Sequence, residues 1–270
     1  MDSWIGLLKK DFLLMKNRLL VFLLIDLAAF ALGWYLHIRE IGFVQQPELN
    51  WVLYDNNDLI KFIPLVIAIG IHVLFIGNYI LMSLNKEGKQ LHLWLHNPQS
   101  AIVLLGSKLV NGFIALILSL GLLIILTTIN LIPFLSEVSF YLGDLTKLLL
   151  YFVVNIIFLS LLIGICFMFF WTIYHVLKSR IGRWSVLVLI ILINLFIWMF
   201  VSLESTAVYN QLVQWGEYKL EFSTLESFNY SDGEFDQMIT NYLGKNLFDT
   251  IFALLLFVIS AWVIEKKVEV

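Results

Sequence analysis

The sequence predicts an all-α polytopic membrane protein with six transmembrane helices and both termini in the cytoplasm. Of its 270 residues, 60% are hydrophobic and only 14% are charged, and the mean hydropathy is +0.89. A soluble domain is about half apolar and about a quarter charged, so one soluble core has no place for this excess. Six long apolar runs follow one another along the chain, and the charge of the segments between them changes sign each time.

Each apolar run is long enough to cross a bilayer as a helix. A hydrocarbon core of about 30 Å needs about 20 helical residues, and a helix satisfies all of its own backbone hydrogen bonds there. The third and fourth runs are longer than this, which predicts helices that tilt or project into the cytoplasm. The predicted spans are Leu19–Ile38, Phe62–Leu84, Ile102–Ile132, Lys147–Leu177, Trp184–Leu203 and Leu247–Ile264.

The charge of the connecting segments predicts the orientation of the spans. Counting Lys108 with the inner side and Lys147 and Asp249 with the outer side, the inner segments contain 12 Lys and Arg residues and 5 Asp and Glu residues, whereas the outer segments contain 5 and 14. Cytoplasmic loops retain Lys and Arg, so the basic side is the inner side. The net charge of -3 therefore reflects the side of the membrane and does not indicate an acidic or basic ligand.

Residues 1–18 predict an amphipathic helix ahead of the first span. Its apolar residues recur at three- and four-residue steps, and its basic residues lie off that stripe. Such a helix suits the inner membrane interface. The alternative is a cytoplasmic extension of the first span. The residues that define the two faces include Trp4, Leu8, Lys9, Lys10 and Phe12.

Residues 86–98, between the second and third spans, predict a short cytoplasmic helix that needs a partner. Its apolar residues share one face, and a proline ends it. A Trp and a Leu exposed on such a helix are rarely left in water, so the membrane surface or another protein is expected to cover them. The predicted contact residues are Lys86, Glu87, Lys89, Gln90, Leu91, Trp94, Leu95 and Pro98.

Two other connections are distinctive. The loop after the fourth span carries Lys178, Arg180 and Arg183, which set the topology; a second partner contact is the alternative. The outer segment, residues 204–246, interleaves acidic and aromatic residues, a composition that argues against disorder and predicts a small helical cap. At about forty residues this cap is too small to fold alone, and it either gates substrate release or covers the bundle.

The motifs of nucleotide, metalloprotease and serine-hydrolase chemistry are absent from the sequence. It contains no GxxxxGK[ST], HExxH or GxSxG, so we expect no catalytic residue, no cofactor bound by this chain and no nucleic-acid partner. His92 and His96 have a metal-ligand spacing, but no carboxylate or cysteine is arranged beside them, so no metal site is predicted. Asp26 and His72 lie inside spans and are candidates for a transport pathway, with structural pairing or packing as the alternative.

The order of these parts resembles the permease subunit of an ABC-2 type (type V) ABC exporter. An interfacial helix leads into the first span, a cytoplasmic helix separates the second and third spans, and an outer excursion precedes the sixth. The residues that carry the resemblance are Lys86-Glu87, Leu91, Trp94-Leu95, Pro98-Gln99-Ser100 and Gly106-Ser107-Lys108-Leu109.

The resemblance implies a bacterial, multi-pass protein of the plasma membrane that works with other chains. Two separate ABC ATPase subunits would bind ATP and Mg²⁺, and a second permease, identical or paralogous, would complete the pathway. Residues 86–98 would form the coupling helix and residues 1–18 the connecting helix. The compact size fits exporters of phenol-soluble modulins and lantibiotics, which implies an amphipathic peptide, drug or lipid-like substrate. The outer segment before the sixth span is larger than the short re-entrant helices usual in the family.

Two other functions compete with this interpretation. An ion-coupled secondary transporter predicts that activity depends on an ion gradient and on Asp26. A membrane enzyme or sensor without an ATPase partner predicts a buried catalytic cluster, and the sequence shows none.

Overall fold

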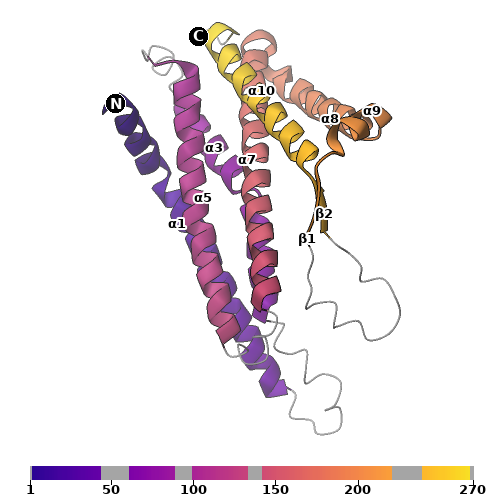
Figure 1. Ribbon diagram of the computed structural model, residues 1–270. Helices are drawn as coiled ribbons and strands as arrows, with labels where there is room; N and C mark the ends of the chain where they lie inside the picture. Colours follow the sequence, from indigo (N-terminus) through magenta and orange to yellow (C-terminus); the bar gives the residue numbers. More distant parts are fainter. Residues whose placement is uncertain (1, 44–60, 89–98, 133–141, 221–238, 268–270) are drawn as a thin grey trace.

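The computed structural model describes residues 2–43, 61–88, 99–132, 142–220 and 239–267 as a bundle of long helices (Figure 1). The long helices are α1 (Asp2–Phe43), α2 (Ile63–His72), α3 (Phe75–Gly88), α5 (Ala101–Leu131), α7 (Leu142–Ile181), α8 (Ser185–Glu204) and α10 (Leu243–Lys267). The shorter elements are the 3-10 turn η4 (Gly182–Trp184), helix α9 (Ala207–Val213) and strands β1 (Glu217–Leu220) and β2 (Ile239–Tyr242).

Several of these helices are long and apolar enough to cross a membrane. In the described part of the chain there are four such segments: Trp4–Arg39, Ala101–Leu131, Thr146–Glu204 and Leu243–Lys266. Helices α2 and α3, bent by 47° at their junction, meet the same criteria together and make a fifth if the bent pair is one span. The chain is therefore a predominantly helical protein that fits the multi-pass membrane class. That there are six spans, and that both termini are cytoplasmic, stay predictions.

The segment Thr146–Glu204 is too long for one crossing. Its 59 residues would extend about 90 Å as one helix, three times a bilayer core of about 30 Å. Gly182, with a φ of +56°, interrupts it between α7 and α8, because this left-handed conformation suits glycine and ends a regular helix. Figure 1 shows α8 turning away from α7 at this point.

The helix ends that the sequence assigns to the inner side lie together. Figure 1 places the start of α1, the end of α3, the start of α5, the end of α7 and the end of α10 at one end of the bundle. The end of α1, the end of α5 and the start of α7 lie at the other.

Helix α1 runs without a break from Asp2 to Phe43, so no helix end appears at residue 18. No Gly or Pro occurs between Gly6 and Gly33 to interrupt it. The buried face is formed by Leu7, Asp11 and Met15, at four-residue steps, whereas Phe12 is 40% exposed. This part of α1 thus packs into the bundle through Leu7, Asp11 and Met15, and the place of residues 1–18 at the inner membrane interface stays a prediction.

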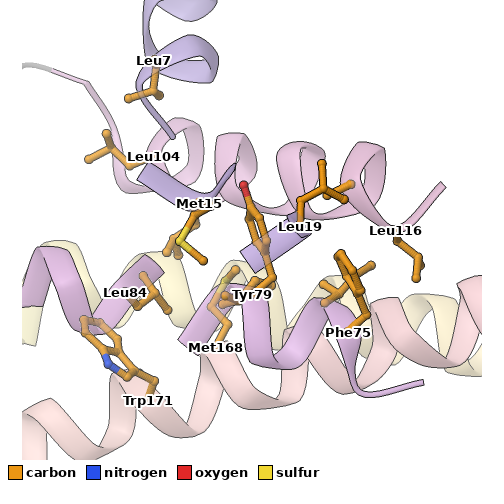
Figure 2. Packing of buried hydrophobic residues seen from close by; sticks show 14 of the residues in the cluster. Leu7, Met15, Leu19, Phe75, Tyr79, Leu84, Leu104, Leu116, Met168 and Trp171 are labelled. Atoms are coloured by element: carbon orange, nitrogen blue, oxygen red, sulfur yellow. The ribbon is translucent and has the colours of Figure 1, made fainter. Parts of the chain in front are cut away.

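The core lies where α1, α3, α5 and α7 meet. Figure 2 shows Met15, Tyr79, Met168 and Phe75 from three of these helices pointing into one cluster. Its members are buried apolar side chains, including Ile76, Ile80, Leu84, Leu105, Leu116 and Trp171.

Small residues mark close contacts within the bundle. At Gly164 on α7 an added Cβ would lie 2.5 Å from Cγ2 of Ile76 on α3. One turn earlier, the Ser160 hydroxyl accepts a hydrogen bond of 3.2 Å from the Ile76 N–H, which lies in the first turn of α3 and has no partner within its own helix. Gly33 on α1 packs directly against the Lys61 backbone.

The outer segment, for which the sequence predicts a helical cap, also contains two strands. After α9, strands β1 and β2 pair antiparallel from Glu217↔Tyr242 to Leu220↔Ile239. The turn into β1 uses Gly216 at φ +65°, a conformation that would strain other residues. Tyr, Ile and Thr in the two strands favour extended structure. Residues 221–238 of the predicted cap lie outside the described residues.

Candidate functional site

Four charged side chains form a closed network where α1, α3 and α5 meet. Lys108 Nζ lies 2.7 Å from Glu87 Oε2 and 3.2 Å from Asp11 Oδ1. Lys10 Nζ lies 2.8 Å from Glu87 Oε1 and 3.9 Å from Asp11 Oδ1. We call Lys10, Asp11, Glu87 and Lys108 the clamp.

Most of the clamp is inaccessible to solvent. The side chains of Asp11 and Lys108 are 0% and 1% exposed, Glu87 is 12% exposed, and only Lys10 reaches solvent at 47%. Its two positive and two negative formal charges cancel. A buried charge is tolerated when it is paired and its remaining hydrogen-bonding groups are satisfied. Ser107 Oγ contributes here by donating to Asp11 Oδ2 at 2.5 Å.

The end of α3 makes further contacts with α1 and α7. Lys86 Nζ donates to the carbonyl oxygen of Leu14 at 2.8 Å. Trp171 Nε1 donates to Asn85 Oδ1 at 2.9 Å, and the Trp171 ring lies against Gly88, where an added Cβ would be 3.0 Å from it. The last turn of α3 is therefore held from three sides.

The first third of α5 is held by α10 and α1. The N–H of Ala101 donates to Glu265 Oε1 at 2.9 Å, so a carboxylate of α10 satisfies one of the free amides at a helix start, where negative charge is favourable. Asn111 Nδ2 donates to the carbonyl oxygen of Leu8 at 3.1 Å. Both helix ends that flank residues 89–98 are thus anchored to neighbouring helices.

The structure describes part of the predicted partner-binding residues. The charged groups of Lys86 and Glu87 are engaged within the chain. Lys178, Arg180 and Arg183 are exposed at the end of α7 and in η4. The remaining predicted contacts lie outside the described residues: Lys89, Gln90, Leu91, Trp94, Leu95 and Pro98.

A second polar site lies deeper in the bundle and joins the two candidate pathway residues. Asp26 of α1, His72 of α2 and Ser119 of α5 are all 0% exposed. Ser119 Oγ lies 2.8 Å from Asp26 Oδ2 and 2.9 Å from His72 Nε2. His72 Nδ1 lies 2.7 Å from the carbonyl oxygen of Ala68, and Asp26 Oδ2 is 3.7 Å from His72 Nε2. We call Asp26, His72 and Ser119 the inner triad.

The clamp was not predicted, although the sequence contains a signal for it. Lys108 stands within a long apolar run, where a lysine needs an acidic partner. Asp11 is four residues from both Leu7 and Met15, on one helix face with them. Spacing alone could place these residues on buried faces but could not pair them.

No protein-family model and no solved structure significantly matches the chain. One relative from Bacillus subtilis (strain 168), described as "Uncharacterized protein YhcE", is 26% identical over 206 residues. The alignment covers 73% of this chain and 72% of the relative.

Proposed function

We propose that the chain is the permease subunit of an ATP-driven exporter whose separate ATPase subunit docks on residues 89–98. The observation that supports this most is the anchoring of both helix ends that flank these residues. The end of α3 is tied to α1, α5 and α7, and the start of α5 is tied to α1 and α10.

This arrangement suits the transmission of force into the bundle. A push on an isolated loop is absorbed by bending of that loop. Here the clamp joins α3 to α1 and α5 through buried ion pairs, so movement of the docking segment would shift these helices together. Packed helices respond to such shifts by moving between discrete arrangements.

The apolar surfaces support an amphipathic or lipid-like substrate and a second permease. An apolar groove of about 500 Å³ opens between α2, α5 and α7, lined by residues such as Phe62, Leu123 and Phe152. Helix α8 leaves large side chains exposed, among them Ile190 and Trp198. An exposed apolar face of this kind suits lipid or a second copy of the bundle.

The first test is the removal of the aromatic anchor from the proposed docking segment. Trp94→Ala is expected to weaken ATPase binding by about 2 kcal/mol or more, roughly 30-fold, as for a buried interface tryptophan. The measurement is affinity purification of the full chain from its native membrane in mild detergent, followed by mass spectrometry.

The matched control is Trp215→Ala, which removes an exposed tryptophan that follows α9. We expect an ATPase with a Walker A motif to accompany the wild type and the control, and to be lost from Trp94→Ala. A chain that repeatedly purifies without an ATPase would contradict the exporter proposal and favour an ion-coupled transporter or an enzyme.

A further inference from the structure

The inner triad contains three hydrogen-bonding contacts, but the His72 Nδ1–H group and the Ser119 hydroxyl supply only two hydrogens. The carbonyl oxygen of Ala68 can only accept, so His72 Nδ1 carries a proton and donates to it. Two contacts remain, from Ser119 Oγ to Asp26 Oδ2 and to His72 Nε2. Each contact needs one proton, and the serine hydroxyl supplies only one. A second proton completes the set.

We propose that the inner triad is a buried proton-binding site that holds one transferable proton. In one arrangement the proton is on Asp26 Oδ2, which donates to Ser119 Oγ, and the serine hydroxyl donates to the neutral Nε2 of His72. In the other, the Asp26 O–H bond has broken, Ser119 has taken that proton and passed its own to Nε2, and an imidazolium faces a carboxylate. Every contact is satisfied in both arrangements, and the net charge is zero in both.

Loss of this proton is unfavourable in such a place. Without it, one of the two contacts has no hydrogen, and a net negative charge remains among side chains that are completely buried. Both effects are costly where water cannot compensate. The other carboxylate oxygen, Asp26 Oδ1, is also buried and has no hydrogen-bond partner. An unpartnered oxygen costs less on a neutral acid than on a carboxylate, so the resting proton belongs to Asp26.

The nearest charged groups along α1 and α5 lie at least two helical turns from the triad. Arg18 precedes Asp26 by eight residues, about 12 Å along α1, and its guanidinium is directed to the Met82 sulfur. Lys108 precedes Ser119 by eleven residues, about 16 Å along α5, and is neutralised in the clamp. The flanking groups on the elements around the triad are Arg18 and His37 on α1, Lys61 before α2, Tyr79 and Lys86 on α3, Lys108 on α5, and Lys147 and His175 on α7.

The position of His72 gives the proton a structural consequence. His72 is the last residue of α2, directly before the 47° bend into α3. Its ring is stacked on Phe75, in the first turn of α3, with the ring centroids 6.0 Å apart. Transfer of the proton to His72 therefore places a positive charge at the junction of the two helices. This site does not depend on an ATPase partner.

The test is infrared spectroscopy of the full chain in lipid vesicles near neutral pH. The wild type is expected to show the C=O stretching band of a protonated carboxyl group, and Asp26→Asn is expected to lose it. The Asn amide can donate to Ser119 as the protonated acid does, so this variant is expected to fold. Glu217→Gln, which removes an exposed carboxylate, is the control and should leave the band unchanged.

A second measurement needs no variant at Asp26. The ¹⁵N signal of His72 Nε2 in the labelled wild type should show an unprotonated, hydrogen-bonded nitrogen, and Ser119→Ala should shift it to that of a nitrogen without a donor. Wild-type and Asp26→Asn spectra with the same carboxyl band would overturn the proposal. So would a wild type without that band and with a neutral His72, because the triad would then hold no transferable proton.

Discussion

Replacing Lys108 by Met is expected to destabilise the protein by about 3–5 kcal/mol, the cost of breaking a buried ion pair from one side. Methionine matches the length of the lysine stem but leaves Asp11 and Glu87 without their shared cation. Glu87 keeps Lys10 at 2.8 Å, whereas Asp11 keeps only the Ser107 hydroxyl and the distant Lys10. The measurement is thermal or denaturant unfolding of the purified chain in detergent.

The control for this variant is Lys9→Met, next to the clamp but exposed, which should change stability by less than about 0.5 kcal/mol. The double variant Lys108→Met with Asp11→Leu should recover part of the loss, because Glu87 and Lys10 then form a matched pair. If Lys108→Met alone unfolds at the wild-type midpoint, the clamp contributes no stability, and its role in transmitting force would also be in doubt.

Replacing Gly164 by Leu is expected to force α7 away from α3, at a cost of about 3 kcal/mol, the upper end of the usual range for overpacking. An added Cβ alone would lie 2.5 Å from Ile76 Cγ2 and 3.3 Å from Ile80 Cδ1. Both isoleucines are completely buried. The variant should lose monodispersity in detergent and unfold at a lower temperature.

Gly121→Leu is the matched control, because an added Cβ at this position on α5 would meet nothing within 4 Å. It should behave like the wild type. The double variant Gly164→Leu with Ile76→Ala exchanges volume between the two helices and should recover part of the stability. Equal stability of the Gly164 and Gly121 variants would show that α3 and α7 do not approach each other as the structure places them.

The location of the helices in the chain could be predicted from the sequence, because helix formation in a membrane depends on local properties. Length, hydropathy and the need to satisfy backbone hydrogen bonds act within one segment at a time. The predicted third span, Ile102–Ile132, corresponds closely to α5, Ala101–Leu131. The break near Gly182 also follows from local composition, because a glycine and three basic residues interrupt two apolar runs.

Local patterns were less informative where two structures suit the same residues. The basic amphipathic pattern of residues 1–18 fits an interfacial helix and also the first turns of a longer helix, and only packing against the bundle distinguishes them. The aromatic and acidic outer segment fitted a helical cap, yet Glu217–Leu220 pairs with the strand Ile239–Tyr242. Strand pairing is a non-local choice that propensity alone does not predict.

The sequence by itself determined that this chain is a helical membrane protein, and it identified Asp26 and His72 as unusual residues in apolar surroundings. Only the tertiary structure decided their partners. Asp11 and Lys108 are 97 positions apart, and Asp26 and Ser119 are 93 apart. The helical period tells which face a residue occupies, but the neighbouring helix and its register follow from the packing of all helices together. That packing brings isolated charges into a neutral clamp and joins an acid, a serine and a histidine in one site.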